Sequence, residues 1–148
     1  MSLPFRHYLR VRYAECDGQK VVFNARYGDY VDVGFTELMR ALGYAEAVAD
    51  GTLEFQLVKQ TLEWRASARY DEVLELRPVV SRLDTTSFTL LTEFRIAGNE
   101  RVIATAETVY VHVDAALTKQ PLTESLRAAL QKGAPGVVSD HAGWPQQS

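Results

Sequence analysis

The segment from Tyr13 to Tyr27 holds the residues best suited to chemistry, because it places a carboxylate in a loop that leads into a helix. It reads Y-A-E-C-D-G-Q-K-V-V-F-N-A-R-Y, and Asp17 lies in the loop. A positioned carboxylate can act as a nucleophile or as a general base. The free backbone N–H groups of a first helical turn can stabilise a developing oxyanion. The segment therefore predicts half of an acyl-transfer site.

The residues alone leave simpler interpretations open. Aspartate followed by Gly18 is typical of a turn, so Asp17 can have a structural role only. Asn24 can cap the helix, orient a site, or do both. Cys16 is a weak candidate for a nucleophile, because no histidine is near it in sequence and its acidic neighbours disfavour the thiolate.

Composition and charge exclude several classes of function. A chain of 148 residues with 47% hydrophobic content fits one domain, residues 1–148. A net charge of -3 lacks the excess of positive charge that attracts nucleic acid or an anionic membrane surface. The N-terminal residues show no apolar leader, so we expect a cytoplasmic protein with no membrane partner. A single cysteine and the absence of a Cys or His cluster imply no disulfide, metal or cofactor.

Hydrophobic periodicity predicts an α+β fold. Residues 5–13 alternate as a strand does, whereas residues 27–42 repeat their apolar side chains at helical steps. Further strands are predicted at residues 55–68, 73–83, 87–97 and 101–113, and a short helix at residues 123–130. Because the connections are too short for crossovers, we expect one long helix on a bent antiparallel sheet of about five strands. Residues 133–148 are predicted to form a mobile tail.

Four residues carry local predictions about these elements. Asn24 is expected to cap the long helix, and Gly43 to end it. Gly34 lies on the apolar stripe of the helix, which suggests close approach to a strand. Pro78 cannot donate to a ladder, so its strand should be bulged or at an edge there.

Residues 102–113 carry apolar side chains on both faces of their strand. Because one helix covers only one face of the sheet, a second copy of the chain is expected to cover the rest, which predicts a homodimer or homotetramer.

Taken together, these motifs resemble the hot dog fold acyl-CoA thioesterases, and most of all the 4-hydroxybenzoyl-CoA thioesterase branch and its acyl-CoA relatives. The resemblance spans residues 9–130 and rests on three motifs in the expected order. They are D-x-x-x-x-V-x-N-A-R-Y before the long helix, T-L-E-W-R-A-S-A-R-Y-D-E-V-L in the strands, and L-D-T-T-S-F-T-L at a sharp strand connection.

The resemblance implies that Asp17 attacks an acyl-CoA thioester or activates water, with the oxyanion donor at the helix start near Asn24. It also implies an acyl pocket between two subunits. We expect substrate contacts from Val22, Phe23, Tyr27, Ser87, Arg65 and Arg69, the two arginines at the phosphates of CoA. Strand arginines are often only a solvated face, and Ser87 can be a turn residue.

Two departures and two alternatives remain. A glycine that is common in the family stands as Lys20 here, so the loop can differ if that position needs positive φ. The N-A-R-Y variant is more similar to the fatty acyl-CoA branch, which leaves a fatty or aromatic acyl group and a CoA or protein carrier open. The alternative function is a non-catalytic hot dog module that binds an acyl group or only dimerises. A hot dog dehydratase is disfavoured, because no histidine lies between Tyr8 and Val111.

Overall fold

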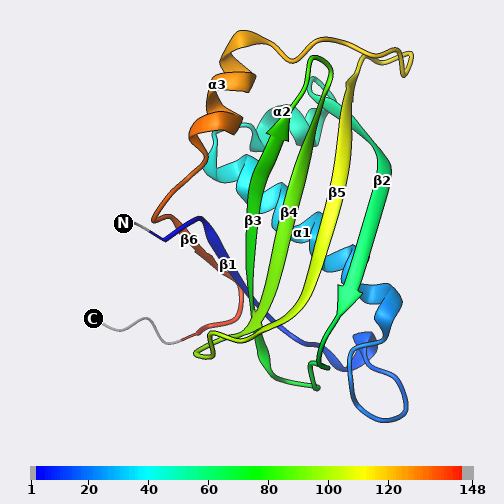
Figure 1. The fold of residues 1–148 in the computed structure, drawn as a ribbon, viewed down its shortest axis with the longest axis vertical. Helices are drawn as coiled ribbons and strands as arrows, with labels where there is room; N and C mark the ends of the chain where they lie inside the picture. The colour runs from blue at the N-terminus through cyan, green and yellow to red at the C-terminus, as the bar shows by residue number, and fades with distance from the viewer. Residues whose placement is uncertain (1–2, 145–148) are drawn as a thin grey trace.

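A long helix, α1 (Tyr27–Ala41), crosses one face of a curved sheet in the computed structural model, which describes residues 3–144 (Figure 1). Its apolar stripe is buried against the sheet, as the periodicity predicted. The helix ends at Gly43, which has a φ of 92°. The N–H of Tyr44 bonds the Met39 carbonyl at 2.9 Å and that of Gly43 bonds the Arg40 carbonyl at 3.0 Å. This is a Schellman end, so the prediction for Gly43 is confirmed.

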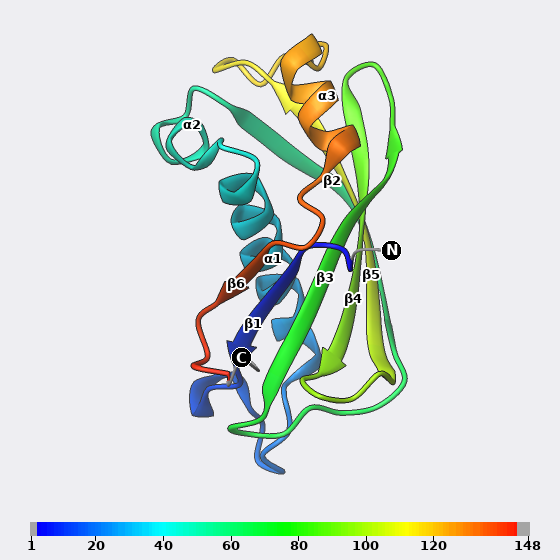
Figure 2. The ribbon, with the colours of Figure 1, turned by 90° about the vertical axis from the view of Figure 1, so that its left-hand side faces the viewer.

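The sheet has six strands rather than about five. They are β1 (Arg6–Arg10), β2 (Glu54–Trp64), β3 (Val73–Leu83), β4 (Ser87–Ile96), β5 (Val102–Val113) and β6 (Val138–Asp140), in the spatial order β2-β5-β4-β3-β1-β6. All pairs are antiparallel except β1 with β6, which is parallel. The expectation of a purely antiparallel sheet is therefore wrong at this edge. Figure 2 shows β1 and β6 curling around α1, away from the layer of β2 to β5.

The C-terminal region is more structured than the sequence suggested. Helix α3 (Glu124–Lys132) begins with Thr123, whose hydroxyl accepts from the Leu126 N–H at 3.2 Å. Beyond it, β6 pairs with β1, and Trp144 stacks on Tyr8 with ring centroids 6.3 Å apart. The prediction of a mobile tail from residue 133 is thus wrong up to residue 144, and residues 145–148 lie outside the described part. A short helix, α2 (Ala45–Asp50), was also not predicted.

Tight connections and one close packing contact fix the sheet on α1. Gly98, with a φ of 83°, turns the chain between β4 and β5. Pro78 pairs with Thr92 of β4 but lies beyond the four residues of β3 that pair with β1, so it stands on a local edge. A Cβ on Gly34 would lie 3.3 Å from Cδ2 of Leu76, which confirms the close approach of helix and strand.

Candidate active site

Asp17 lies in a tight turn on the surface, between η1 (Tyr13–Glu15) and α1. Its Oδ1 accepts from the Gln19 N–H at 2.8 Å, and its carbonyl accepts from the Lys20 N–H at 3.0 Å. The turn closes when the Asp17 N–H bonds the Val21 carbonyl at 2.9 Å. The carboxylate is exposed, with one oxygen engaged in the turn. It is therefore held in place and remains open to a substrate.

Backbone bonds on both flanks hold this turn. The Val22 N–H bonds the Ala68 carbonyl at 2.9 Å, and the Phe23 N–H bonds the Glu15 carbonyl at 2.9 Å. The Tyr70 N–H reaches the Lys20 carbonyl at 2.9 Å. Lys20 has a φ of 62°, so the position does need the left-handed conformation that glycine adopts most readily. Lysine therefore adopts this conformation here at a cost in backbone strain.

Asn24 opens a short 3-10 turn, η2 (Asn24–Arg26), which runs directly into α1. The position that precedes the helix is Arg26, and no side chain accepts a capping hydrogen bond there. The prediction that Asn24 caps α1 is therefore wrong. The reason is that the 3-10 turn already uses the early donors: the Arg26 N–H bonds the Phe23 carbonyl, and the Tyr27 N–H bonds the Asn24 carbonyl.

Four of the predicted site residues meet at one cavity of about 250 Å³ beside the start of α1. Val22 and Tyr27 are buried in its wall, whereas Asn24 and Arg65 are exposed. The remaining lining residues come from the end of β2 and the segment after it: Trp64, Ala66 and Ser67. The cavity is small for a complete ligand. It opens beside β2, the edge strand of the sheet.

Three predicted residues stand apart from this cavity. Phe23 is 55% exposed, and Arg69 is exposed beside the turn, bridged through its backbone to Val21. Ser87 pairs with Val111 of β5, whereas Trp64 pairs with Ala104. At about 3.4 Å per residue, those seven steps along β5 separate Ser87 from the cavity by roughly 24 Å. Within one chain, Ser87 is therefore remote from the other site residues.

Cys16 is no better a nucleophile in the structure than in the sequence. Its thiol donates weakly to the Arg12 carbonyl, with sulfur and oxygen 3.6 Å apart. Burial, together with the carboxylates of Glu15 and Asp17, raises the pKa of the thiol. The reactive thiolate is therefore scarce at neutral pH.

A buried network that the sequence did not reveal lies on the other side of the loop. The Glu15 carboxylate is 7% exposed and receives four hydrogen bonds. They come from the Arg12 backbone N–H at 2.8 Å, its Nε at 2.9 Å, its Nη2 at 2.6 Å and the Tyr30 hydroxyl at 2.9 Å. Burial alone would raise the pKa of Glu15, but the bonds from Arg12 and Tyr30 hold it below its ordinary value.

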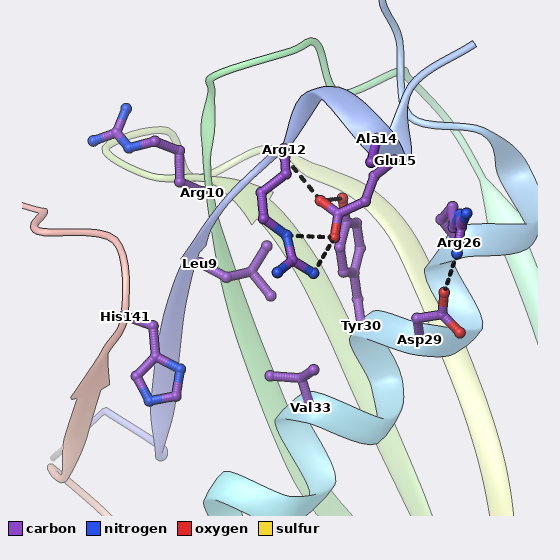
Figure 3. Close-up of a pocket in the computed structure, with 10 residues that line it drawn as sticks. All are labelled: Leu9, Arg10, Arg12, Ala14, Glu15, Arg26, Asp29, Tyr30, Val33 and His141. Atoms are coloured by element: carbon purple, nitrogen blue, oxygen red, sulfur yellow. Dashed lines mark hydrogen bonds and ion pairs between the residues drawn. The ribbon is translucent and has the colours of Figure 1, made fainter.

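This network borders a cavity of about 620 Å³ (Figure 3). The cavity lies between the N-terminal half of α1, the end of β1 and the segment after β6. Its lining residues are Leu9, Arg10, Arg12, Ala14, Glu15, Arg26, Asp29, Tyr30, Val33 and His141. Within residues 3–144, no group of three or more His, Cys, Asp or Glu side chains is arranged to hold a metal ion. Nor is any helix in that range long and apolar enough to cross a membrane.

The arrangement of strand, loop, helix and sheet is that of a known family. The model of the thioesterase-like superfamily matches residues 11–130. The chain belongs to this superfamily. The matched range contains the Asp17 turn, all of α1 and strands β2 to β5. Membership confirms the expectation that the chain is of the thioester hydrolase class, with a hot dog fold.

Individual thioesterase-like superfamily proteins agree with this assignment. The acyl-CoA thioester hydrolase YbgC of Escherichia coli O6:H1 is 29% identical over 111 residues, which cover 74% of this chain and 82% of that protein. A putative esterase of Aquifex aeolicus is 28% identical over 88 residues, or 59% of this chain and 69% of its own.

A solved gentisyl-coenzyme A thioesterase superposes with a TM-score of 0.77 at 24% identity, covering 84% of this chain and 98% of its own. A 1,4-dihydroxy-2-naphthoyl-CoA thioesterase from Synechocystis gives a TM-score of 0.76 at 18% identity, covering 86% of this chain and 95% of its own. At these identities the two structures show a shared fold.

Proposed function

We propose that the protein hydrolyses an acyl-CoA to the free acid and CoA, with Asp17 as the catalytic carboxylate. The observation that carries the proposal is the fixed and exposed Asp17 turn, in the segment that leads through η2 into α1. The likeness to YbgC, named an acyl-CoA thioester hydrolase, supports the same reaction. A positioned carboxylate can suffice for the hydrolysis of a thioester, because the thioester carbonyl is electrophilic and a thiolate leaves readily.

In this reaction the Asp17 carboxylate either adds to the thioester carbonyl or takes a proton from water that adds to it. The tetrahedral oxyanion is stabilised by a backbone N–H at the turn around Asn24, where the chain starts its helical path. Collapse of the intermediate breaks the C–S bond and releases the thiolate of CoA. In the water route the protonated Asp17 carboxyl returns its proton to this thiolate, which restores the carboxylate. Where Asp17 adds directly, water then hydrolyses the mixed anhydride and restores the carboxylate.

The acyl group enters the cavity beside α1 in this account. Val22 and Tyr27 give it a buried apolar wall, and Arg65 is an exposed part of its lining. Phe23 lies outside this lining, exposed at the surface next to Val22 in the chain. Arg69, beside the turn at Val21, is placed to meet the part of the substrate that extends into solvent. The roles of these residues, and that of Ser87, are part of the proposal.

The proposal includes a second copy of the chain. Strand β2 is an eleven-residue edge strand whose surface exposes Leu57 at 45%, Val58 at 55% and Trp64 at 43%. A long edge strand with exposed apolar side chains can pair with another strand, although the pairing of β2 is irregular between Leu57 and Lys59. A homodimer formed through β2 would cover these side chains and enclose the cavity next to Trp64. It would also bring residues of the partner to the site.

A non-catalytic acyl-binding or dimerisation module is the competing function. The test is a panel of aromatic and C4 to C18 acyl-CoAs, with the released thiol detected by a thiol reagent. Hydrolysis of at least one class, lost in Asp17→Ala while the fold and assembly are kept, supports the thioesterase. Binding of acyl-CoA without release of thiol from any member would establish the module instead.

A further inference from the structure

The 620 Å³ cavity has no part in the chemistry just described, yet it has the volume and lining of a ligand site. Three arginines line it: Arg10 at the end of β1, Arg12 just after it and Arg26 ahead of α1. Figure 3 shows Arg12 in the middle, beside Glu15, with Arg10 at the left and Arg26 at the right. Leu9 and Val33 add an apolar patch to its wall. The pattern of several guanidinium groups beside an apolar surface suits a phosphate-bearing ligand.

The partners of these arginines leave donors for such a ligand. Arg26 meets Asp29 at 3.2 Å, but the two side chains are 48% and 64% exposed, so the pair is weak. Arg10 uses one N–H on the Asp71 carbonyl and one on the Ala142 carbonyl, and its ion pair with Asp71 is long at 3.6 Å. Arg12 already neutralises the buried Glu15. A guanidinium carries five N–H donors, so each arginine keeps some free.

The cavity adjoins the Asp17 loop. Ala14 and Glu15 line it just ahead of Asp17, and Arg26 lines it just after Asn24. The chain around Phe23 is bonded to Glu15 on one side and, through the Val22 N–H, to Ala68 on the other. Hydrogen-bonded backbone segments lie about 4.8 Å apart, so these two pairs place Glu15, on the wall of the larger cavity, roughly 10 Å from Ala68, beside the wall of the smaller cavity. A phosphopantetheine arm can span that separation.

We infer that this arginine-lined cavity binds the phosphate end of the phosphopantetheine arm that carries the acyl group, an inference that rests on the proposed thioesterase function. The thioester lies at Asp17, and the phosphates extend over the loop to Arg10 and Arg26. The same phosphate chemistry is present in CoA and in a phosphopantetheinylated carrier protein. Arg65 and Arg69 then contact the arm near the thioester rather than the phosphates.

The test compares one acyl group on three carriers: pantetheine without phosphate, CoA, and an acyl carrier protein. In the variant Arg10→Gln/Arg26→Gln, kcat/KM should fall about tenfold or more on a phosphorylated carrier, mostly through KM. On acyl-pantetheine it should stay within about twofold, which also shows that the variant is folded. Loss on CoA and loss on the carrier protein both support the cavity, and the comparison identifies the source of the phosphate.

Two further variants give a control and an effect of opposite sign. Arg82→Gln removes an exposed arginine paired with Asp84 outside the cavity and should leave all three substrates unchanged. Asp29→Asn releases Arg26 from its carboxylate and should lower KM for the phosphorylated substrate about two- to threefold. Equal losses on acyl-pantetheine and acyl-CoA in the double variant, or no loss on either, would overturn the inference. So would a wild type that hydrolyses acyl-pantetheine as efficiently as both phosphorylated substrates.

Calorimetric measurement of the binding of unacylated CoA distinguishes failure of the proposed thioesterase function from failure of the cavity assignment. If the wild type hydrolyses no thioester but binds CoA, and the double variant loses that affinity about tenfold, the cavity is a phosphate site and the catalytic proposal alone is wrong. If neither CoA nor phosphopantetheinylated carrier protein binds more weakly to the double variant than to the wild type, the cavity assignment is wrong.

Discussion

The phenolic hydroxyl of Tyr30 donates a 2.9 Å hydrogen bond to the Glu15 carboxylate, and so ties the first turn of α1 to the segment just ahead of Asp17. The same carboxylate accepts three bonds from Arg12. A buried charge held by four donors is costly to disturb, because any lost partner leaves it under-satisfied. This network therefore fixes the position from which the Asp17 loop departs.

Tyr30→Phe should accordingly lower both stability and turnover. The lost bond ends on a charged acceptor, so the free energy of unfolding should fall by about 1.5–3 kcal/mol, as measured by urea denaturation. Tyr13→Phe is the matched control, because Tyr13 is 69% exposed and should change the free energy by less than about 0.5 kcal/mol. If the two variants are equally stable, the hydrogen bond seen here does not hold the loop.

Acid should destabilise the protein through His7, a fully buried side chain of β1. Burial and the nearby His141 lower its pKa to about 4, although Glu37, Asp140 and a hydrogen bond with the backbone of Ser139 act in the opposite direction. The unfolded chain then binds more protons between about pH 6.5 and pH 4. Stability is complete above pH 6.5 and is lost as the pH falls through that window, by about 3 kcal/mol in total.

The measurement for His7 is the free energy of unfolding at pH 7 and at pH 4.5 in wild type and in His7→Gln. Glutamine retains hydrogen-bonding capacity for Ser139 but does not titrate. The variant should show a shallower decline with acid than the wild type. An unchanged slope would mean that other groups, such as the Glu15 network, control the acid limb.

Assembly through the β2 edge predicts the effect of a charge placed there. Val58→Lys should weaken or abolish the dimer, because a lysine on an edge strand opposes pairing with a second edge. Light scattering at micromolar concentration measures the mass directly. Val79→Lys on β3, which is 41% exposed in the wild type, is the matched control and should leave the mass unchanged. A wild type that is monomeric and fully active would contradict the role given to the second subunit.

The packing of α1 on the sheet predicts a cost for any larger residue at position 34. Gly34→Val should lower the free energy of unfolding by about 1–3 kcal/mol, because its Cβ meets the Leu76 side chain at 3.3 Å and its methyl groups go further. Gly28→Ala is the control in the same helix, since its Cβ meets only the end of the Gln60 side chain at 3.4 Å. That substitution should stabilise the helix by up to about 1 kcal/mol. Thermal melts of both variants test the contrast.

The sequence predicted the elements that carry their own periodicity. The helical repeat of residues 27–42 and the alternation in β4 reflect faces that are buried in the final fold, so α1 and β4 were found close to their true bounds. Strand β6 has three residues, too few for any period. It exists because β1 offers a free edge to it, which is a tertiary effect. Gly, Pro and Ser around it were therefore mistaken for a mobile tail.

The candidate site also contains residues that a local sequence motif predicts and residues that only the tertiary packing brings together. Asp17, Asn24 and Tyr27 lie within one continuous segment, so a local motif identified them together. Arg65 lines the 250 Å³ cavity together with Asn24 and Tyr27, because β2 ends beside the start of α1. Tyr30 and Glu15 are fifteen residues apart and meet only through the packing of helix on loop, which no spacing in the sequence signals. The positive φ of Lys20 is visible only in the structure, since lysine gives no hint of it.

The catalytic role of Asp17 is tested most directly by Asp17→Asn, assayed on the best acyl-CoA substrate of the wild type. Asparagine keeps an oxygen to accept the 2.8 Å bond from the Gln19 N–H, so the turn and the fold should remain. The charge that attacks the thioester or activates water is lost, so kcat/KM should fall by about 100-fold or more. A variant that stays within about threefold of the wild type would show that Asp17 only shapes the turn.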